Sequence, residues 1–424
     1  MDQADSEQLV VGQDARDKRK RLLKWLSIGL AVLAVIVISV AIAYPLTKRP
    51  QGTRFEVPTT VVIDDTRAHL VFGEGRGNMV TEAIIEVASE VDHVTVHIDE
   101  FSVSDRADYD NKDKIYDPVV KFDNIESDTG TLVKYAVGSK YHPEDNARFK
   151  VSIFIPTFFD GDLTIDGTTL DIKTWCLGNA NLRLLHLSTD IGNITLHNGT
   201  RTEVGSYGEP TIRAKALYAN IRQKGSIHLN APMLAQEYPH DFHTHLETRD
   251  GDITFEAVTN MFSTFSFGKN KPWERTDMTN TLNYFDFVTH KGNINFDVQF
   301  HQYLRGPWYM GMTKIDARAD QGSVLGRMQV GWLVNVFVDL QATQGCNLHL
   351  SNNFEGALTV ISSTRNATVV PSPKNTHILK DLRPPQRGLK YIFKSSDGKP
   401  FGIGTVSLKT THGDAGLYFD DYNY

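Results

Sequence analysis

The sequence predicts a mainly β protein, in which a β-solenoid or β-helix-like repeat domain follows one N-terminal transmembrane helix. An uncharged apolar stretch near the amino terminus predicts the helix, and a recurring glycine phrase followed by alternating apolar residues predicts the repeats. With 40% hydrophobic and 22% charged residues, the chain can also bury a sizeable core. A β-sandwich of short strands separated by turns is the alternative fold.

Residues 25–45 are predicted to form the transmembrane helix. No charged residue occurs between Trp25 and Tyr44, and at about 1.5 Å per residue this stretch spans about 30 Å, the thickness of a bilayer's hydrocarbon core. Lysine and arginine are more numerous before the stretch than directly after it, so the positive-inside rule predicts a cytoplasmic amino terminus. The C-terminal domain would then be extracellular or lumenal. A cleaved signal peptide is the alternative, since Ala41, Ile42 and Ala43 fit a small-x-small cleavage site.

The remaining segments follow from composition and periodicity. Residues 1–24 are predicted to be a disordered cytoplasmic tail and residues 46–57 a polar stalk. Residues 58–424 form the predicted extracytoplasmic β domain, with a repeat core at about 150–360 and closing strands at about 388–420. Val94, Val96 and Ile98 alternate with polar residues, as in a strand with one buried face. The segment 81–91 fits either a short helix or a strand.

The glycine phrase occurs as DGDLTI (160–165), IGNITL (191–196), KGSIHL (224–229), DGDITF (250–255) and KGNINF (291–296), with weaker copies at 321–326, 355–360 and 412–419. Its glycines recur at intervals of about 26 to 41 residues: Gly161, Gly192, Gly225, Gly251, Gly292 and Gly322. Glycine permits the positive φ or the close backbone approach that a corner requires, and the alternation after it sends apolar side chains inward. Each repeat therefore predicts two or three short strands that stack on the next repeat.

The segment RFKVSIFIPTFFDGDLTIDGTTLDIKT (148–174), followed by the successive glycine phrases, resembles the putative-adhesin domain family of microbial cell-surface proteins. The resemblance covers roughly residues 80–360. It implies a β-helical array of short coils, often behind one membrane anchor, with a role at the cell surface. It transfers no catalytic residues. The repeats of this chain are longer and less regular than the family's, so the resemblance implies no particular ligand.

Covalent modification is predicted at two kinds of residue. Asn193, Asn198 and Asn366 begin N-glycosylation sequons on the predicted outer side of the membrane, where they would be glycosylated in a eukaryotic cell. Cys176 and Cys346 could form a disulfide in an oxidising compartment, provided that their Cα atoms come close enough.

Few residues suggest a metal-binding or catalytic site. A strand would place His243, His245 and Glu247 on one face, where they could bind Zn²⁺, although a solvated strand face is the preferred interpretation. We therefore predict no metal and no cofactor. Asp162, Asp250 and Asp252, in the glycine phrases, are interpreted as turn residues, although stacked carboxylates could also bind Ca²⁺ or act on polysaccharide. Neither a nucleotide-binding loop nor a serine nucleophile motif is present, so the sequence has no catalytic signature.

The longest repeat, between Gly251 and Gly292, holds the predicted binding patch: Phe262, Phe265, Phe267, Trp273 and Arg275. Aromatic and arginine side chains on an exposed insertion would recognise protein or sugar, whereas buried rings would instead cap an apolar face. The net charge of −7 argues against a nucleic-acid partner.

The sequence thus predicts a single-pass membrane-anchored surface protein with a non-catalytic, adhesin-like repeat domain. Its predicted partners are the membrane and cell-wall or matrix polysaccharide or a surface protein. The alternatives are a carbohydrate-active enzyme on a β-helix and a membrane-tethered accessory or sensor protein.

Overall fold

The computed structural model describes residues 53–55, 59–63, 66–72, 78–88, 90–103, 118–127, 130–139, 147–157, 159–175, 177–197, 212–235, 242–260, 282–301, 312–329, 335–352, 354–372, 378–381, 388–395 and 404–421. The predicted tail (1–24) and transmembrane helix (25–45) lie outside these ranges. Within them, no helix has the length and hydropathy needed to cross a bilayer. The chain divides into Met1–Arg54 and Phe55–Tyr424, and the second unit holds almost all described residues.

The second unit is mainly β, as predicted, and all regular elements in the described ranges are strands. The segment 81–91, which fitted a helix or a strand, falls largely within β4 (Asn78–Ala88). A short strand, β1 (Thr53–Phe55), lies at the boundary of the two units, within the predicted stalk.

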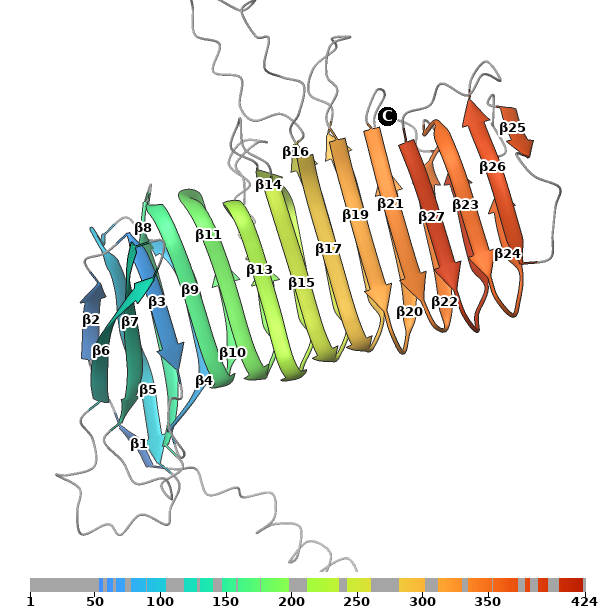
Figure 1. The fold of residues 1–424 in the computed structure, drawn as a ribbon. Coiled ribbons are helices and arrows are strands. Elements are labelled where there is room, and N and C mark those ends of the chain that lie inside the picture. The colour runs from blue at the N-terminus through green and yellow to red at the C-terminus, as the bar shows by residue number, and fades with distance from the viewer. Residues whose placement is uncertain are drawn as a thin grey trace, which may run out of the picture. The chain divides into compact units, whose positions relative to one another are not determined.

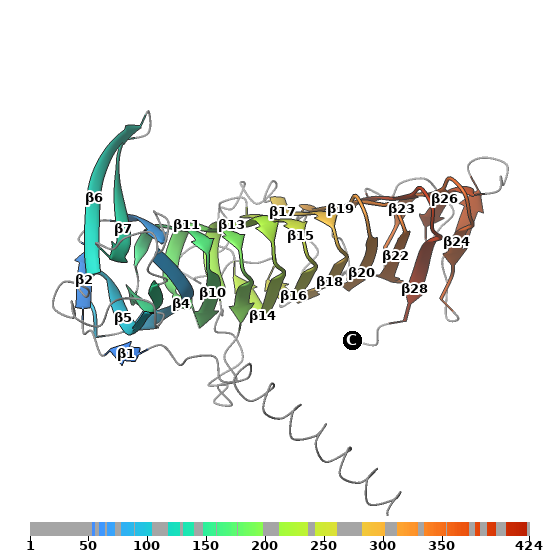
Figure 2. The same ribbon diagram turned by 90° about the horizontal axis from the view of Figure 1, so that it is seen from below.

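The pairings arrange the other strands in two rows (Figures 1 and 2). The first sheet contains, in spatial order, β6 (Pro118–Ser127), β7 (Gly130–Ser139), β3 (Arg67–Phe72), β9 (Asp160–Thr169), β11 (Leu177–Ile191), β13 (Ile212–Lys224), β15 (Phe242–Asp250), β17 (Leu282–Lys291), β19 (Met312–Ala319), β21 (Asn335–Ala342), β27 (Gly404–Thr410), β23 (Gly356–Ser362), β26 (Leu389–Ser395) and β25 (Ile378–Asp381).

The second sheet contains β2 (Thr59–Ile63), β5 (Val94–Val103), β8 (Ala147–Pro156), β4, β10 (Asp171–Trp175), β12 (Ile194–His197), β14 (Ile227–Ala235), β16 (Ile253–Asn260), β18 (Ile294–His301), β20 (Ser323–Gln329), β22 (Gly345–Ser351), β28 (Ala415–Asp420) and β24 (Ala367–Val370).

From β9 to β22 the chain alternates between the sheets, and we call one strand of each sheet with the corner between them a coil. Each strand pairs in parallel with the corresponding strand of the next coil; β16 and β18, for example, match residue for residue from Ile253↔Ile294 onward. Apolar side chains at matching positions are fully buried and form rows between the sheets, as Ile227, Ile253 and Ile294 do. Each coil thus covers the apolar residues of its neighbours, which no single coil could bury alone.

The corners explain the glycines. Gly225 has φ +150°, and a Cβ added to it would lie 1.8 Å from the carbonyl oxygen of Gly192 in the previous coil. Gly251, Gly292 and Gly322 repeat this contact with the glycine before them, at 1.9, 2.0 and 1.7 Å. A side chain at these positions would overlap with the backbone of the preceding coil, so only glycine fits.

One glycine of the predicted series does not belong to this stack. Gly161 lies in β9 of the first sheet, and the corner of its coil is at Leu170, whose carbonyl oxygen would lie 2.2 Å from a Cβ at Gly192. The corner near Gly345 escaped the sequence pattern because a buried cysteine, not a polar residue, follows the glycine.

Both ends of the described stack contain a coil that is inserted out of chain order. At the C-terminal end β27 lies between β21 and β23, and β28 lies between β22 and β24. At the N-terminal end β3 lies between β7 and β9, and β4 between β8 and β10. Antiparallel strands then follow outside the inserted coils, namely β26 on β23 and β5 on β8 (Figure 1).

A buried lysine joins the elements of the C-terminal end. The Lys394 side chain of β26 is 0% exposed, and its Nζ donates to the backbone oxygens of Phe354 (2.9 Å) and Asn352. The ammonium also lies 4.8 Å from the ring centroid of Phe419 in the inserted β28. Burial lowers the pKa of Lys394 to about 8.

Candidate functional site

The polar residues that follow the corner glycines, together with Asp171 at the first corner, form a hydrogen-bond ladder along the corners. At successive corners a side-chain oxygen accepts the backbone N–H of the equivalent residue in the next coil, at 2.7 to 3.2 Å. The members of this corner ladder are Asp171, Asn193, Ser226, Asp252, Asn293 and Ser323. Asp252 is therefore a structural turn residue, as the preferred interpretation of the sequence had it, and its carboxylate holds two coils together.

The second feature is the outer face of the first sheet. On β15, Thr244, Leu246 and Thr248 are buried, whereas His243, His245 and Glu247 alternate with them on the outer face. The predicted placement of the two histidines and the glutamate on one strand face is thus confirmed. Neighbouring strands add Tyr218, Asp286 and further ionisable side chains at matching positions.

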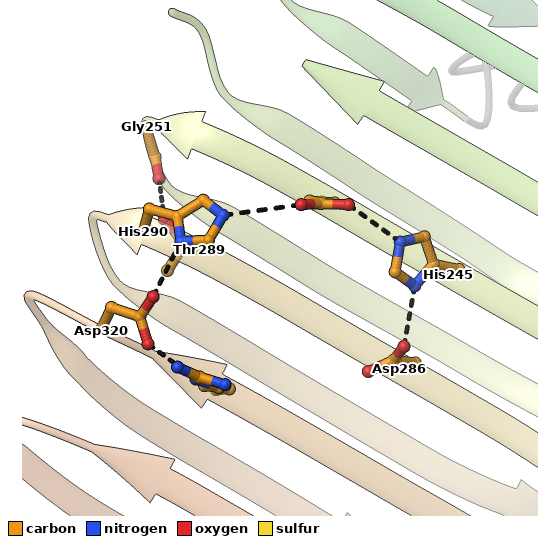
Figure 3. A network of polar contacts seen from close by, with 8 residues as sticks. His245, Gly251, Asp286, Thr289, His290 and Asp320 are labelled. Atoms are coloured by element: carbon orange, nitrogen blue, oxygen red, sulfur yellow. Dashed lines mark hydrogen bonds and ion pairs between the residues drawn. The ribbon is translucent and has the colours of Figure 1, made fainter. Parts of the chain in front are cut away.

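A chain of polar contacts crosses this face from β15 to β19 (Figure 3). His245 Nδ1 lies 2.8 Å from Asp286 Oδ2, and its Nε2 lies 3.3 Å from Glu247 Oε2. Glu247 Oε1 is 3.6 Å from His290 Nε2, and His290 Nδ1 is 2.7 Å from Asp320 Oδ2. The hydrogen bond to Asp286 raises the pKa of His245, because the carboxylate stabilises the protonated ring.

His243 contacts other residues than His245 does. Its ring stacks on Tyr284, with centroids 4.8 Å apart and planes 13° apart, and its Nδ1 lies 3.1 Å from the Tyr218 hydroxyl. Burial lowers the pKa of His243, and the neighbouring His245 lowers it further. His243 Nδ1 and both nitrogens of His245 therefore face different partners, and His243 Nε2 is buried without a hydrogen-bond partner. Among the described residues, no group of three or more His, Cys, Asp or Glu side chains could hold a metal ion.

The other predicted site residues divide into those that the structure describes and those that it does not. The predicted binding patch (Phe262, Phe265, Phe267, Trp273 and Arg275) lies outside the described residues, as do Asn198 and Cys176. Asn193 and Asn366 are both exposed, and their glycosylation stays a prediction.

The predicted disulfide needs correction. Cys346 is a buried free thiol, and burial raises its pKa to about 12. Its strand, β22, is six parallel pairings away from β10, which ends at Trp175 next to Cys176 in the chain. At about 4.8 Å per pairing this is about 29 Å, whereas the Cα atoms of a disulfide lie within about 7 Å.

The sequence analysis missed a groove on the outer face of the second sheet. It has a volume of about 310 Å³ and lies across β16, β18, β20 and β22; its polar lining includes Glu256, Asp297, Arg327 and His349. These residues come from four separate coils and occupy matching positions on them. In the sequence each one is an ordinary polar residue of a half-exposed strand, so no local signal distinguishes it.

The comparisons with known proteins add little. No family model matches the chain, and no curated protein matches it. A putative cell adhesion protein from Clostridium sporogenes aligns over 86% of this chain and 99% of its own, at 8% identity and a TM-score of 0.20. A putative adhesin from Parabacteroides distasonis aligns over 87% and 98%, at 9% identity and a TM-score of 0.22. At such TM-scores neither likeness carries an argument about function.

Proposed function

We propose that the chain is a single-pass, membrane-anchored surface protein whose β domain is a solenoid with a non-catalytic binding role. Its partner would be cell-wall or matrix polysaccharide or a protein of another surface. The uncharged stretch at 25–45 supports the anchor, because its length matches a bilayer's hydrocarbon core. The coil-by-coil parallel pairing supports the solenoid.

One observation carries the binding role: the two edges of the stacked coils differ. The corner edge is closed by the glycine stack and the corner ladder. At the opposite edge the strands of the second sheet end and those of the first sheet begin, so the connecting segments 198–211, 236–241, 261–281, 302–311 and 330–334 all join strand ends there. A regular scaffold that gathers connecting segments of different lengths at one edge suits recognition, since such segments could differ without changing the coils.

The direct test replaces residues 261–281, which hold the predicted binding patch, by a Gly-Ser linker of equal length. The full chain in nanodiscs would be measured for binding to isolated wall and matrix material. We expect at least tenfold weaker binding and an unchanged unfolding temperature. The matched control replaces 302–311 at the same edge. Equal binding by both replacements and the unaltered chain would contradict the proposed role of 261–281.

The alternative function is a carbohydrate-active enzyme, and one observation favours it. Glu256 and Asp297 are register partners on β16 and β18, and both line the groove. Burial raises the pKa of Asp297, as a general acid for glycoside hydrolysis requires. Release of reducing sugar from wall polysaccharide, lost in Glu256→Gln and Asp297→Asn, would replace the binding role by catalysis.

A further inference from the structure

The groove of the second sheet has a defined floor and rim. Its floor includes Gly326 and Phe296, and a Cβ added at Gly326 would lie 2.2 Å from Phe296 Cζ. The phenyl ring therefore occupies the space that a side chain at 326 would need. Leu325, at 48% exposure, lies on the rim and gives the groove an apolar wall next to polar ones.

A polar row crosses the groove. Glu256, Asp297, Arg327 and His349 are successive register partners on β16, β18, β20 and β22. Neighbouring members are therefore about 4.8 Å apart along the stack. The row presents two carboxylates, then a guanidinium and an imidazole, so two hydrogen-bond acceptors are followed by two groups that can donate, over about 14 Å.

One acceptor in this row has no hydrogen-bond partner. Asp297 Oδ1 is buried and unpaired, whereas Oδ2 of the same carboxylate lies 3.9 Å from Arg327 Nη1. A buried acceptor without a donor is unfavourable, so such an atom calls for an explanation. If the partly exposed Asp297 side chain turned this oxygen toward the groove, a ligand hydroxyl would supply the missing donor.

Neighbouring residues hold two other members of the row in place. Asn230 Nδ2 donates to Glu256 Oε2 at 3.4 Å. The His349 ring stacks on Tyr418 at 4.9 Å, and its Nδ1 lies 3.0 Å from Asp420 Oδ2. Side chains that are fixed before binding lose little entropy when a ligand arrives.

We propose that this groove binds a neutral, hydroxyl-rich ligand, namely a short segment of a polysaccharide. Hydroxyl groups both donate and accept, and so match a row that contains carboxylates as well as a guanidinium. Glu256 and Asp297 would repel an anion, and among the described residues no group of three His, Cys, Asp or Glu side chains is placed to hold a metal ion. The apolar rim and floor suit the C–H faces of sugar rings. The inference rests on the proposed surface role and adds to it a ligand class and a second place of binding, on the outer face of the second sheet and separate from the edge that carries residues 261–281.

The test is calorimetric titration of the full chain in nanodiscs prepared without glycoside detergents, which would themselves compete. The probes are cellohexaose, laminarihexaose and N-acetylchitohexaose. We expect at least one to bind, and its affinity to fall at least tenfold in Leu325→Trp, which fills the groove from its rim, and in Asp297→Asn. The matched control is Asp339→Asn on the outer face of the first sheet, which should bind like the unaltered chain.

Two results would overturn the inference. One is that none of the three oligosaccharides binds to the unaltered chain. The other is that a probe binds equally well to Leu325→Trp, Asp297→Asn and the control, since the site would then lie elsewhere. In both cases the proposed surface role is tested separately, by measuring whether the unaltered chain binds to isolated wall or matrix material. Thermal unfolding of each variant shows whether a lost affinity reflects the groove or a lost fold.

Discussion

The middle coils and the C-terminal end follow different rules of assembly. Between β9 and β22, coils that are consecutive in the chain are neighbours in space. At the C-terminal end the chain skips one position after β22, forms β23 and β24, and then returns with β27 and β28 to occupy the gap. In the middle, paired strands are therefore separated by a few tens of residues in the sequence. At the C-terminal end β22 pairs with β28, which follows much later in the sequence.

The two regions are therefore stabilised in different ways. A middle coil is fixed by its own glycine and by a corner-ladder residue directly after it. The C-terminal end depends on a segment late in the sequence that buries Val406, Leu408 and Leu417 between strands from earlier in the sequence. Outside the inserted coils, the antiparallel strands β26, β5 and β6 cover edges of parallel strands that could otherwise pair with other chains.

The largest effect should come from deleting residues 404–424, which removes β27 and β28. The deletion exposes the apolar rows of four strands at once, so we expect a loss of more than about 5 kcal/mol in the region 335–395. Hydrogen exchange would show this region exchanging as if unfolded, while β11 to β18 stay protected. Deletion of residues 422–424 alone is the control, and protection of β21 to β24 without β27 would refute the insertion.

A single corner glycine should come next. Gly225→Ala places a Cβ against the Gly192 carbonyl at a positive φ, and we expect unfolding to become easier by more than about 3 kcal/mol. Gly345→Ala is the matched control, since its Cβ would meet no atom closer than 3.6 Å. The control should change stability by less than about 1 kcal/mol. Similar losses in the two variants, measured by denaturant titration, would contradict the account of the corners.

A ladder residue should matter less than a glycine. Asn293→Ala removes the oxygen that accepts the Ser323 N–H at 3.0 Å. The substitution also removes the bond that Asn293 Nδ2 donates to Asp252 Oδ1 at 3.3 Å. The loss of these two exposed hydrogen bonds should lower the free energy of unfolding by about 1–2 kcal/mol. Asn220→Ala, on the outer face of β13, removes an asparagine that does not belong to the corner ladder and serves as the control. Equal stability of both variants would show that the corner ladder contributes nothing measurable.

The smallest effect concerns pH, within the middle coils. The folded state raises the pKa of His245 through Asp286, so its stabilising contribution is present below the unfolded pKa of about 6.5 and is lost as pH rises through the folded value. His245→Gln should therefore destabilise more at pH 5.5 than at pH 8, by less than about 1 kcal/mol.

His186 provides the opposite sign for comparison. Burial lowers its pKa, so its folded state loses stability as pH falls from about 6.5 through the folded value. His186→Gln should remove that loss and become relatively more stable at pH 5.5. Denaturant titrations at the two pH values check both variants, and the same sign for both would contradict the assigned contacts.

The sequence was informative where the physical cause is local. Glycine followed by Asp, Asn or Ser predicted corners correctly at Gly192, Gly225, Gly251 and Gly292, since both the close approach and the ladder bond belong to those two residues. The pattern failed at Gly161, where the same letters fall inside a strand. Alternation correctly placed His243 and His245 on one strand face.

Features that depend on distant partners could not be predicted. Nothing near Gly404 or Ala415 indicates that these strands return between β21 and β24, because the missing neighbour is defined by coils earlier in the chain. The groove could not be predicted for the same reason, since only the register of β16, β18 and β20 brings Glu256 and Arg327 into one row. The disulfide prediction failed for the same reason: sequence shows how many residues separate two cysteines but not how many strands.

Disulfide trapping across β21 tests the inserted coil most directly. Gln341 and Lys409 are register partners that face outward on β21 and β27, whereas Ile361 lies one strand further, on β23. In the full chain, Gln341→Cys with Lys409→Cys should form a disulfide under mild oxidation, detected by mass spectrometry of the linked peptides, and Gln341→Cys with Ile361→Cys should not. Efficient linkage of residues 341 and 361 without linkage of 341 and 409 would contradict the inserted coil.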